Sequence, residues 1–358
     1  MGRQWILNDQ KGFEDSLEYQ ENVRSLSADD LGPNDVLVEI HAASLNYREL
    51  QIARPNSING PIQVPVVPGC DGAGIVKAVG SSVQEFQPGD RVITKTAPKV
   101  AESRGDDAYS TVADVFPMLG QGTDGTLRSE GIFSQWGLVH APKSLGWLES
   151  ATLTCTWGTA WNVLFGVKGR DVGPGTWVLV QGTGGVSVAV LQLAVAAGAS
   201  VIATTSTEEK AARLRELGAA GTVNYTSNPA WGAEARILTP DGRGFDIVAD
   251  VGGNETLPQS LAAVRVDGVV SVVGGVGDAA AASVPLFAVL LSTCIVRGFL
   301  GSSRSQLREV ARYIDEKNIK PAVDDVVFEL AEAKDAYRRL EEKKHFAKVV
   351  IRVDHLEG

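Results

Sequence analysis

The sequence has few cysteines and no long hydrophobic run. Its three cysteines, Cys70, Cys155 and Cys294, are too few and too scattered for a disulfide framework, which favours a reducing compartment. A transmembrane helix is not expected, because no run of about 18 apolar residues is present. The N-terminal segment lacks the apolar core of a signal peptide. We therefore expect a cytoplasmic protein.

The sequence also lacks an excess of basic residues. Its 358 residues include 33 Lys and Arg against 43 Asp and Glu, a formal net charge of −10. We therefore expect no binding to nucleic acid and no binding to an anionic membrane surface. Hydrophobic residues make up 44% and charged residues 21%, as is usual for globular proteins, and the length favours two domains.

A glycine-rich turn between apolar segments is the most informative feature that the sequence contains. Trp177–Gln181 is a short apolar run that predicts a strand buried on both faces. From Val186 the apolar residues recur at helical spacing, and Gly198 ends the predicted helix. Val201–Thr204 then predicts a second strand. The order is therefore strand, turn, helix, strand.

The turn itself predicts phosphate binding. Gly182 allows a tight bend, and Gly184 allows the backbone to approach a pyrophosphate at the start of the helix. The third small position is Ser187 rather than glycine. Because the turn lies between a strand and a helix, we interpret it as a dinucleotide site rather than a glycine turn without a ligand. The predicted contacts are Gly182, Thr183, Gly184, Gly185 and Val186.

Residues after 156 alternate between predicted helices and strands, which indicates an α/β doubly wound parallel sheet. Further helices are expected at Thr156–Phe165, at Glu208–Leu217 with a capping box of Ser206 and Glu209, and at Pro229–Leu238. Further strands are expected at Thr222–Tyr225, Phe245–Val251, Val269–Val273 and Cys294–Leu300. Ligands bind at the carboxyl ends of such strands, so Gly252 and Gly274 are candidate cofactor contacts.

The first 150 residues favour short strands with Gly and Pro turns, typical of a mainly β barrel or sandwich. The expected strands are Val36–Ala42, whose alternation puts Val36, Val38 and Ile40 on one face, and Ile75–Val79, Arg91–Thr94 and Ser134–His140. Residues 96–131 are polar and rich in glycine, and we expect them to form a long surface excursion or lid. The C-terminal part predicts helices at Gln306–Glu316 and Ala333–Glu342 and a strand at Ala347–Val353.

The end of the second strand indicates which cofactor is used. NAD-binding folds place an acidic residue there to accept from the ribose 2′-OH, whereas this chain has Ala203–Ser206 and no acid. Ser206 can donate to a 2′-phosphate, and Lys210 lies one helical turn away. Tyr225 can reach the phosphate or pack against adenine. These residues predict a preference for NADPH.

Several motifs resemble the medium-chain dehydrogenase/reductase superfamily, on its quinone-oxidoreductase-like, zinc-independent side. They are Asn46–Tyr47, Pro68–Gly74, Gln87–Val92, Thr154–Ala160 and Gln181–Val186. The resemblance implies a GroES-like catalytic domain of residues 1–156 and 303–358 and a Rossmann domain of residues 157–302. It also implies an active site in the cleft between them and a homodimer.

The resemblance also bears on metal binding. Zinc-dependent relatives have cysteine where this chain has Asn46, His–Glu where it has Cys70–Asp71, and cysteine where it has Cys155. We expect no metal, because the first thiolate is lost and residues 90–140 lack the cysteines of a structural zinc lobe. A residual site made by Cys70, Asp71 and Cys155 stays open as the alternative.

The resemblance places Asn46 and Tyr47 near the nicotinamide and the substrate, as catalytic residues. An amide N–H or a phenol O–H can donate to an oxygen that gains charge, and the phenol can also supply a proton. Further cofactor contacts are implied for Thr159, Phe299, Leu300 and Lys348.

These observations together predict an NADPH-dependent reductase that transfers hydride to a conjugated C=C bond of a small molecule. An enone, an enoyl compound or a quinone would be its substrate. One alternative is an NADP(H)-dependent alcohol dehydrogenase or carbonyl reductase, with or without zinc. The other is a nucleotide-binding protein with little turnover and a structural role.

Overall fold

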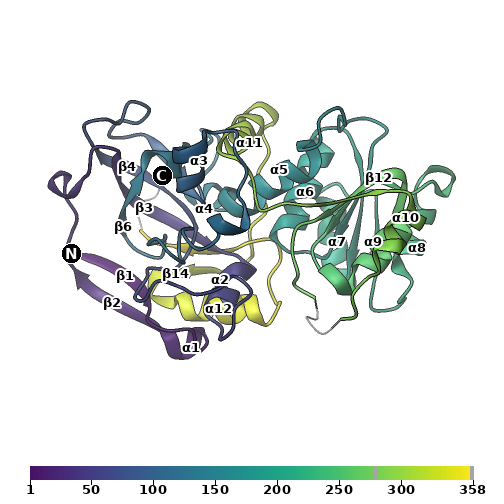
Figure 1. The fold of residues 1–358 in the computed structure, drawn as a ribbon, viewed down its shortest axis with the longest axis horizontal. Coiled ribbons are helices and arrows are strands. Elements are labelled where there is room, and N and C mark those ends of the chain that lie inside the picture. Colours follow the sequence, from purple (N-terminus) through teal and green to yellow (C-terminus); the bar gives the residue numbers. More distant parts are fainter. Residues whose placement is uncertain (278–280, 355–358) are drawn as a thin grey trace. The chain divides into compact units, whose positions relative to one another are not determined.

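The computed structural model describes residues 1–277 and 281–354 (Figure 1). The chain forms two compact units. Unit 1 comprises Met1–Gly158 and Ser302–Gly358, and unit 2 comprises Thr159–Gly301. No helix among the described residues has the length and apolar character needed to cross a membrane.

Unit 2 is built on a six-stranded parallel sheet with the order β10-β9-β8-β11-β12-β13. The prediction of a doubly wound parallel sheet is therefore confirmed. The central strand β8 carries Val178, Leu179 and Val180, all fully buried, as expected for a strand covered on both faces. The strands are β8 Trp177–Gln181, β9 Ser200–Thr205, β10 Gly221–Asn224, β11 Phe245–Asp250, β12 Val264–Val272 and β13 Ile295–Gly298.

Helices cover the sheet of unit 2. α6 packs on β8 and β9, α7 packs on β9 and β10, and α8, α9 and α10 lie side by side (Figure 1). The helices are α5 Gly158–Phe165, α6 Gly185–Ala196, α7 Glu208–Glu216, α8 Trp231–Ile237, α9 Leu257–Ala263 and α10 Leu286–Ser292. Gly198, with φ 89°, follows the end of α6, where its left-handed backbone suits glycine.

The predicted capping box of α7 is wrong by one residue. Thr207, not Ser206, is the N-cap, and its side chain accepts from the backbone N–H of Lys210 at 3.3 Å. The reason is that β9 pairs with β10 as far as Thr205 and Asn224, which keeps the chain extended beyond the strand end. The helix therefore begins at Glu208, and Ser206 keeps its hydroxyl outside the cap.

Unit 1 is mainly β. Its sheet has the order β14-β15-β3-β4-β5-β7, with β6 paired to β3, and β1 and β2 form a separate hairpin. The strands are β1 Gly2–Leu7, β2 Leu17–Val23, β3 Asp35–Leu45, β4 Asp71–Val79, β5 Arg91–Thr94, β6 Glu130–Ser134, β7 Leu138–His140, β14 Val327–Glu329 and β15 Val349–Arg352. The helices are α1 Phe13–Ser16, α2 Tyr47–Ile52, α3 Pro98–Arg104, α4 Trp147–Ser150, α11 Arg304–Lys317 and α12 Ala333–Glu341.

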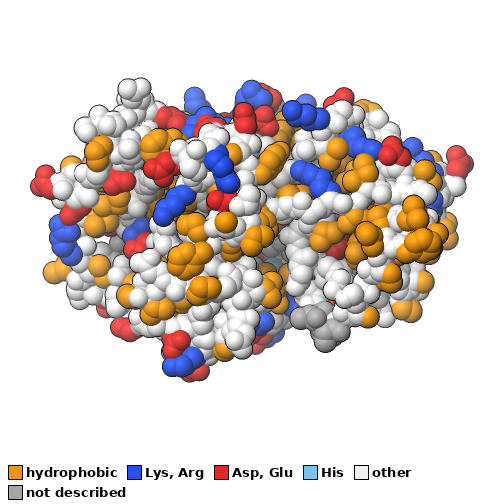
Figure 2. Space-filling model, in the orientation of Figure 1, with side chains coloured by type: hydrophobic (Ala, Val, Ile, Leu, Met, Phe, Trp, Pro, Cys, Tyr) orange, Lys and Arg blue, Asp and Glu red, His pale blue; other side chains and the backbone are white. Residues whose placement is uncertain are grey.

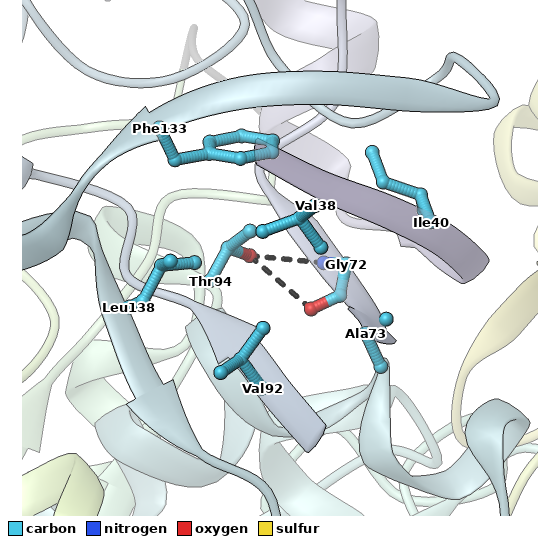
Figure 3. Close-up of a pocket in the computed structure, with 9 residues that line it drawn as sticks. Val38, Ile40, Gly72, Ala73, Val92, Thr94, Phe133 and Leu138 are labelled. Carbon is cyan, nitrogen blue, oxygen red and sulfur yellow. Dashed lines mark hydrogen bonds between the residues drawn. The ribbon is translucent and has the colours of Figure 1, made fainter. Parts of the chain in front are cut away.

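The central strand of unit 1 is buried on both faces. β3 pairs with β4, β6 and β15. Val36, Val38 and Ile40, which were expected on one face, are buried, and Leu37 between them is buried as well. Side chains from β3, β5, β6 and β7 surround one small space on a face of this sheet (Figure 3). The space between them is too small for a water molecule, so this interior is a packed core and not a binding cavity.

Two expectations for the segment between β5 and β7 are wrong. Residues 96–131 contain α3, and their second half is buried, with Leu119 at 2% and Leu127 at 0% exposure. Gly120 and Gly125 lie so close to the backbone of Gly69 that a side chain would overlap it, so these glycines serve close packing and not a lid. The strand expected over Ser134–His140 is divided into β6 and β7 by a 3₁₀ turn at Gln135–Gly137.

Candidate active site and cofactor-binding turn

The turn between β8 and α6 has the backbone that phosphate binding requires. Gly182 has φ 72°, and its N–H donates to the carbonyl of Thr204 at 3.0 Å. Gly184 is the N-cap of α6 and offers no side-chain cap. Among the described residues, no atom lies within 4 Å of where a Cβ of Gly182 or Gly184 would stand. The first N–H groups of α6 therefore begin beside a backbone that a pyrophosphate can approach.

Small residues hold this turn in place. Ser187 is buried and donates to the carbonyl of Gln181 at 2.6 Å, which ties the first turn of α6 to the end of β8. A serine at the third small position therefore serves the close packing of helix and strand that glycine provides elsewhere. The remaining predicted contacts, Thr183, Gly185 and Val186, lie in the same turn and the first residues of α6.

A buried polar network at the ends of β8 and β11 was missed by the sequence analysis. Asp250 is fully buried and accepts from Ser260 Oγ at 2.5 Å, from Gln181 Nε2 at 3.3 Å and from the N–H of Gly253 at 2.9 Å. These bonds orient the turn at Gly252. Asp250, an acidic residue near the end of the predicted strand Phe245–Val251, was the sequence signal that could have indicated this buried network.

The two glycine turns after β11 and β12 lie next to each other. A Cβ on Gly253 would come within 3.4 Å of the carbonyl oxygen of Gly274 and of Gly275 Cα. The parallel register of β11 and β12 explains this contact, because it brings the carboxyl ends of neighbouring strands to one edge. Gly252 and Gly274 are thus placed at the edge where ligands of such sheets bind.

Residues expected to bind the 2′-phosphate come together at the end of β9. The N–H of Tyr225 donates to the carbonyl of Thr205 at 3.1 Å, and Asn224 Nδ2 donates to the carbonyl of Ser206 at 3.4 Å. Tyr225 is 42% exposed, and Ser206 and Lys210 are half-buried. No acidic side chain lies between Ala203 and Thr207. Asn224 was missed, because only the sheet register places it beside Ser206.

The remaining candidates in unit 2 lie on α5 and after β13. Thr159 is 6% exposed, and Leu300 is 39% exposed. The guanidinium of Arg297 lies over the ring of Phe299 at 4.4 Å and binds Asn162 with two hydrogen bonds. Their contacts with a cofactor stay predictions.

A buried polar cluster in unit 1 surrounds the predicted catalytic residue Asn46. Lys348 is 3% exposed, and its Nζ donates to the carbonyl of Leu45 at 2.8 Å, to Asn46 Oδ1 at 2.6 Å and to Asp71 Oδ2 at 3.0 Å. Asn46 Nδ2 has only a weak acceptor, the Sγ of Cys70 at 3.6 Å. An ammonium group has three N–H donors, and these three acceptors match that number; the cofactor contact expected of Lys348 stays a prediction.

Tyr47 is the first residue of α2. Asn46 caps this helix, and its backbone N–H donates to Glu49 Oε2 at 2.7 Å. Tyr47 is half-buried and packs on the core of unit 1. The contact with Glu341 at 2.8 Å raises the pKa of the Arg54 guanidinium, and the neighbouring Tyr47 adds to that rise. The capping bond therefore fixes the backbone that carries both predicted catalytic residues.

Lys95, which the sequence analysis did not select, is also buried in unit 1. It follows β5 and is 5% exposed. Burial lowers the pKa of Lys95 to about 8, while Cys155 and Cys70 oppose that shift. Nothing in the sequence around the predicted strand Arg91–Thr94 indicates that the lysine after it is buried, because that burial depends on tertiary packing.

The fold and these two groups of residues define a two-domain oxidoreductase with a dinucleotide-binding sheet and a mainly β catalytic domain. Residues 32–144 match the family model of the alcohol dehydrogenase GroES-like domain, and residues 185–316 match that of zinc-binding dehydrogenase. The chain belongs to the medium-chain dehydrogenase/reductase superfamily, as its motifs predicted. A solved relative is named for its dependence on NAD, a nicotinamide cofactor.

Three comparisons illustrate the range of relatives. The chain is 40% identical over 329 residues to a zinc-type alcohol dehydrogenase-like protein of Schizosaccharomyces pombe, covering 90% of this chain and 92% of that protein. It is 31% identical over 309 residues to the crotonyl-CoA carboxylase/reductase of Cereibacter sphaeroides, covering 75% and 68%. A solved NAD-dependent alcohol dehydrogenase shares 32% identity at a TM-score of 0.83, covering 98% and 100%.

The zinc ion that the family description implies does not fit this donor set. Asp71 already accepts from Lys348, from Ser44 Oγ at 3.1 Å and from the backbone N–H of Cys155 at 3.1 Å. A lysine ammonium among the candidate ligands also repels a cation. No set of three metal-ligating side chains occurs among residues 1–277 and 281–354.

Proposed function

We propose that this protein is an NADPH-dependent reductase of conjugated C=C bonds, with an enone, enoyl compound or quinone as substrate. The contact of Lys348 with Asn46 and Asp71 carries the proposal, because it puts an ammonium and an amide where a metal-dependent relative needs ligands. Conjugate reduction suits such a site: the substrate oxygen needs hydrogen-bond donors, and the hydride goes to a carbon atom farther along the molecule.

The donors of this chain are suited to that oxygen. The nicotinamide cofactor, when bound, supplies the hydride. Lys348 holds Asn46 Oδ1 and so orients the amide, whose Nδ2 can exchange its weak bond to Cys70 for a bond to the substrate oxygen. The half-buried Tyr47 adds a phenol O–H from the next position in the chain. Both donors act without a metal ion.

The arrangement at the end of β9 supports NADPH as the cofactor. Ser206, Lys210 and Tyr225 lie at this strand end, and no carboxylate follows β9 to repel a 2′-phosphate. Of the relatives compared above, crotonyl-CoA carboxylase/reductase is named for reduction of a conjugated thioester, which favours the C=C assignment. The name of the NAD-dependent alcohol dehydrogenase instead favours carbonyl or alcohol chemistry as the second candidate.

A steady-state assay separates the candidates. Enones, quinones, enoyl thioesters and aldehydes are offered with NADPH or NADH, before and after treatment with a zinc chelator. We expect NADPH-dependent loss of the conjugated C=C absorbance, insensitive to the chelator. Oxidation of alcohols or reduction of aldehydes alone, lost on chelation, would establish the second candidate. Cofactor binding without any turnover would establish the structural role.

We also propose that the protein is a homodimer. β13 is the last strand of its sheet and pairs only with β12 among the described residues, so one backbone edge is unpaired. Next to it, α10 exposes large apolar side chains, and Figure 2 shows hydrophobic side chains gathered there. Their exposed fractions are Leu286 84%, Phe287 63%, Leu290 64% and Leu291 70%. A second copy can pair the same edge about a twofold axis and cover this face.

A further inference from the structure

Lys95 is a buried cation without an acidic partner among residues 1–277 and 281–354. Its backbone N–H donates to the carbonyl of Gly137 at 2.7 Å, which continues the pairing of β5 and β7 beyond Thr94. Its ammonium makes no ion pair and no hydrogen bond within the part of the chain that the structure describes. Lysine is almost never buried without a partner, since removal of its charge from water costs several kcal/mol.

The neighbours of Lys95 fix it beside the polar cluster. Thr94 Oγ1 donates to the carbonyl of Cys70 at 2.7 Å, and Thr154 Oγ1 donates to the carbonyl of Thr94 at 2.8 Å. The backbone before Lys95 is thus bonded to the residues that precede Asp71 and Cys155. Thr94 points into the packed interior of the sheet (Figure 3), so Lys95 projects from the opposite face.

The titratable groups around Lys95 are thiols. Cys155, from the turn before α5, and Cys70, from the segment before β4, are the two that act on its pKa. Asp71 and Glu49 act on Cys70 instead, and Asp71 is bound by Lys348. With burial lowering the pKa of Lys95 to about 8, its ammonium is mostly protonated at neutral pH and gives up its proton readily.

We infer that Lys95 is the catalytic acid of this protein: its ammonium contacts the carbonyl oxygen of the conjugated substrate and donates the proton that completes the reduction. The inference rests on the proposed C=C reduction. Hydride addition to the β-carbon forms one C–H bond and moves the C=C electron pair into an enolate. Lys95 transfers one N–H proton to the enolate oxygen, its amine regains a proton from water, and the enol tautomerises to the saturated ketone.

The two buried lysines, Lys348 and Lys95, have different roles because their hydrogen-bond partners differ. Lys348 is saturated by three acceptors, one of them the carboxylate of Asp71, and is therefore a positioning residue for Asn46. Lys95 has no such acceptor, so an enolate oxygen supplies the negative charge that its surroundings lack. Because its ammonium has no such acceptor, Lys95 also favours substrates whose oxygen gains negative charge during the reaction.

The test compares Lys95→Met with Lys99→Met. Lys99 is an exposed lysine on α3 and serves as the matched control. We expect Lys95→Met to lower kcat for the enone by roughly 10²- to 10³-fold, the range for loss of a positioned acid. The wild-type kcat should fall above about pH 8 as Lys95 loses its proton, and the variant should lack this limb. The control Lys99→Met should keep both the wild-type kcat and its fall at basic pH.

A second readout does not depend on turnover. Folding lowers the pKa of Lys95 from 10.5 to about 8, so the unfolded chain binds its proton more tightly. The stability of the wild type relative to Lys95→Met should therefore rise as the pH increases from about 8 towards 10.5. Urea unfolding of the wild type and of Lys95→Met between about pH 8 and 10.5 measures this difference in the free energy of unfolding. The same experiment shows that the variant folds.

The outcomes separate the two proposals. A wild type that reduces no conjugated substrate overturns the proposed function and this inference with it. A wild type that reduces the enone, with a folded Lys95→Met that keeps its turnover and its pH limb, overturns the role of Lys95 alone. Loss of turnover in Lys95→Met with the basic limb retained assigns the proton to another group and also overturns it.

Discussion

At the residue scale, the predicted catalytic pair is held by backbone and buried contacts. Asn46 caps α2 through Glu49 and receives the ammonium of Lys348 on its amide oxygen. Tyr47, one position on, is half-buried and lies near Arg54. The amide of Asn46 is therefore fixed in orientation, whereas the side chain of Tyr47 is half-buried.

Substitution of Tyr47 by Phe tests its phenol O–H as a donor. We expect turnover on the conjugated substrate to fall by roughly 10²-fold, as when one donor to a developing oxyanion is lost. NADPH binding and the pH dependence assigned to Lys95 should be unchanged, because the phenol belongs to neither. Steady-state kinetics and fluorescence titration with NADPH measure these effects. Full turnover in the variant would show that Tyr47 serves packing alone.

Lys210 belongs to the residue scale as well, since its charge distinguishes the two cofactors. Two charge-assisted hydrogen bonds of about 1.5 kcal/mol each, from Ser206 and Lys210, predict a preference for NADPH on the order of a hundredfold. Lys210→Ala should lower that preference roughly tenfold. Arg215→Ala is the control, because Arg215 lies on the same helix but binds Glu208 and Thr222. Equal kcat/KM for NADPH and NADH in the wild type would show that this phosphate site is misassigned.

At the scale of elements, the connection from β8 to α6 combines two different uses of glycine. Gly182 has a positive φ that the bend requires, so any side chain strains the backbone there. Gly184 has φ −76°, a value open to every residue, and no protein atom among the described residues lies near its Cβ position. The open space beside Gly184 is where the predicted pyrophosphate would approach the backbone, and glycine also suits the N-cap position that this residue occupies.

A pair of alanine substitutions separates these uses. Gly182→Ala should lower the free energy of unfolding by about 1–2 kcal/mol, because alanine is strained at positive φ. Gly184→Ala should cost less stability but weaken NADPH binding at least about tenfold, because its methyl group fills the space of the pyrophosphate. Urea unfolding and NADPH titration measure the two quantities. Wild-type affinity in Gly184→Ala would mean that no phosphate approaches this backbone.

At the scale of the whole molecule, a strand edge and an apolar helix face of unit 2 are left uncovered by the residues that the structure describes. The residues concerned lie on β13 and α10. Exposed apolar surface of this extent next to an unpaired strand promotes association, and identical edges can pair with each other. Association of two copies would continue the six-stranded sheet across the twofold axis.

A charged α10 should abolish this association. We expect the wild type to elute with the mass of a dimer and the double variant Phe287→Glu, Leu290→Glu to elute as a monomer, measured by size-exclusion chromatography with light scattering. Ile237→Glu is the control, because Ile237 is 76% exposed on α8, away from β13. A monomeric wild type, or a dimer that persists in the double variant, would contradict the proposed interface.

The sequence by itself determined two things about this protein: its local secondary structure and the family to which it belongs. Strand β8, the glycine turn and α6 were predicted from apolar periodicity and glycine chemistry, because both act between residues close in the chain. The parallel sheet followed from the alternation of such units. The motif with Asn46 and Tyr47 contributed to the resemblance that identified the family, and its catalytic role stays a prediction.

Only the tertiary structure decided which distant residues meet. Lys348 on the last part of the chain reaches Asn46 and Asp71, and Lys95 is buried in the folded unit 1. The burial of Leu127 and the place of Asn224 beside Ser206 also depend on pairing between separate segments. Charge burial and register are properties of the packed chain, and no spacing along the sequence encodes them.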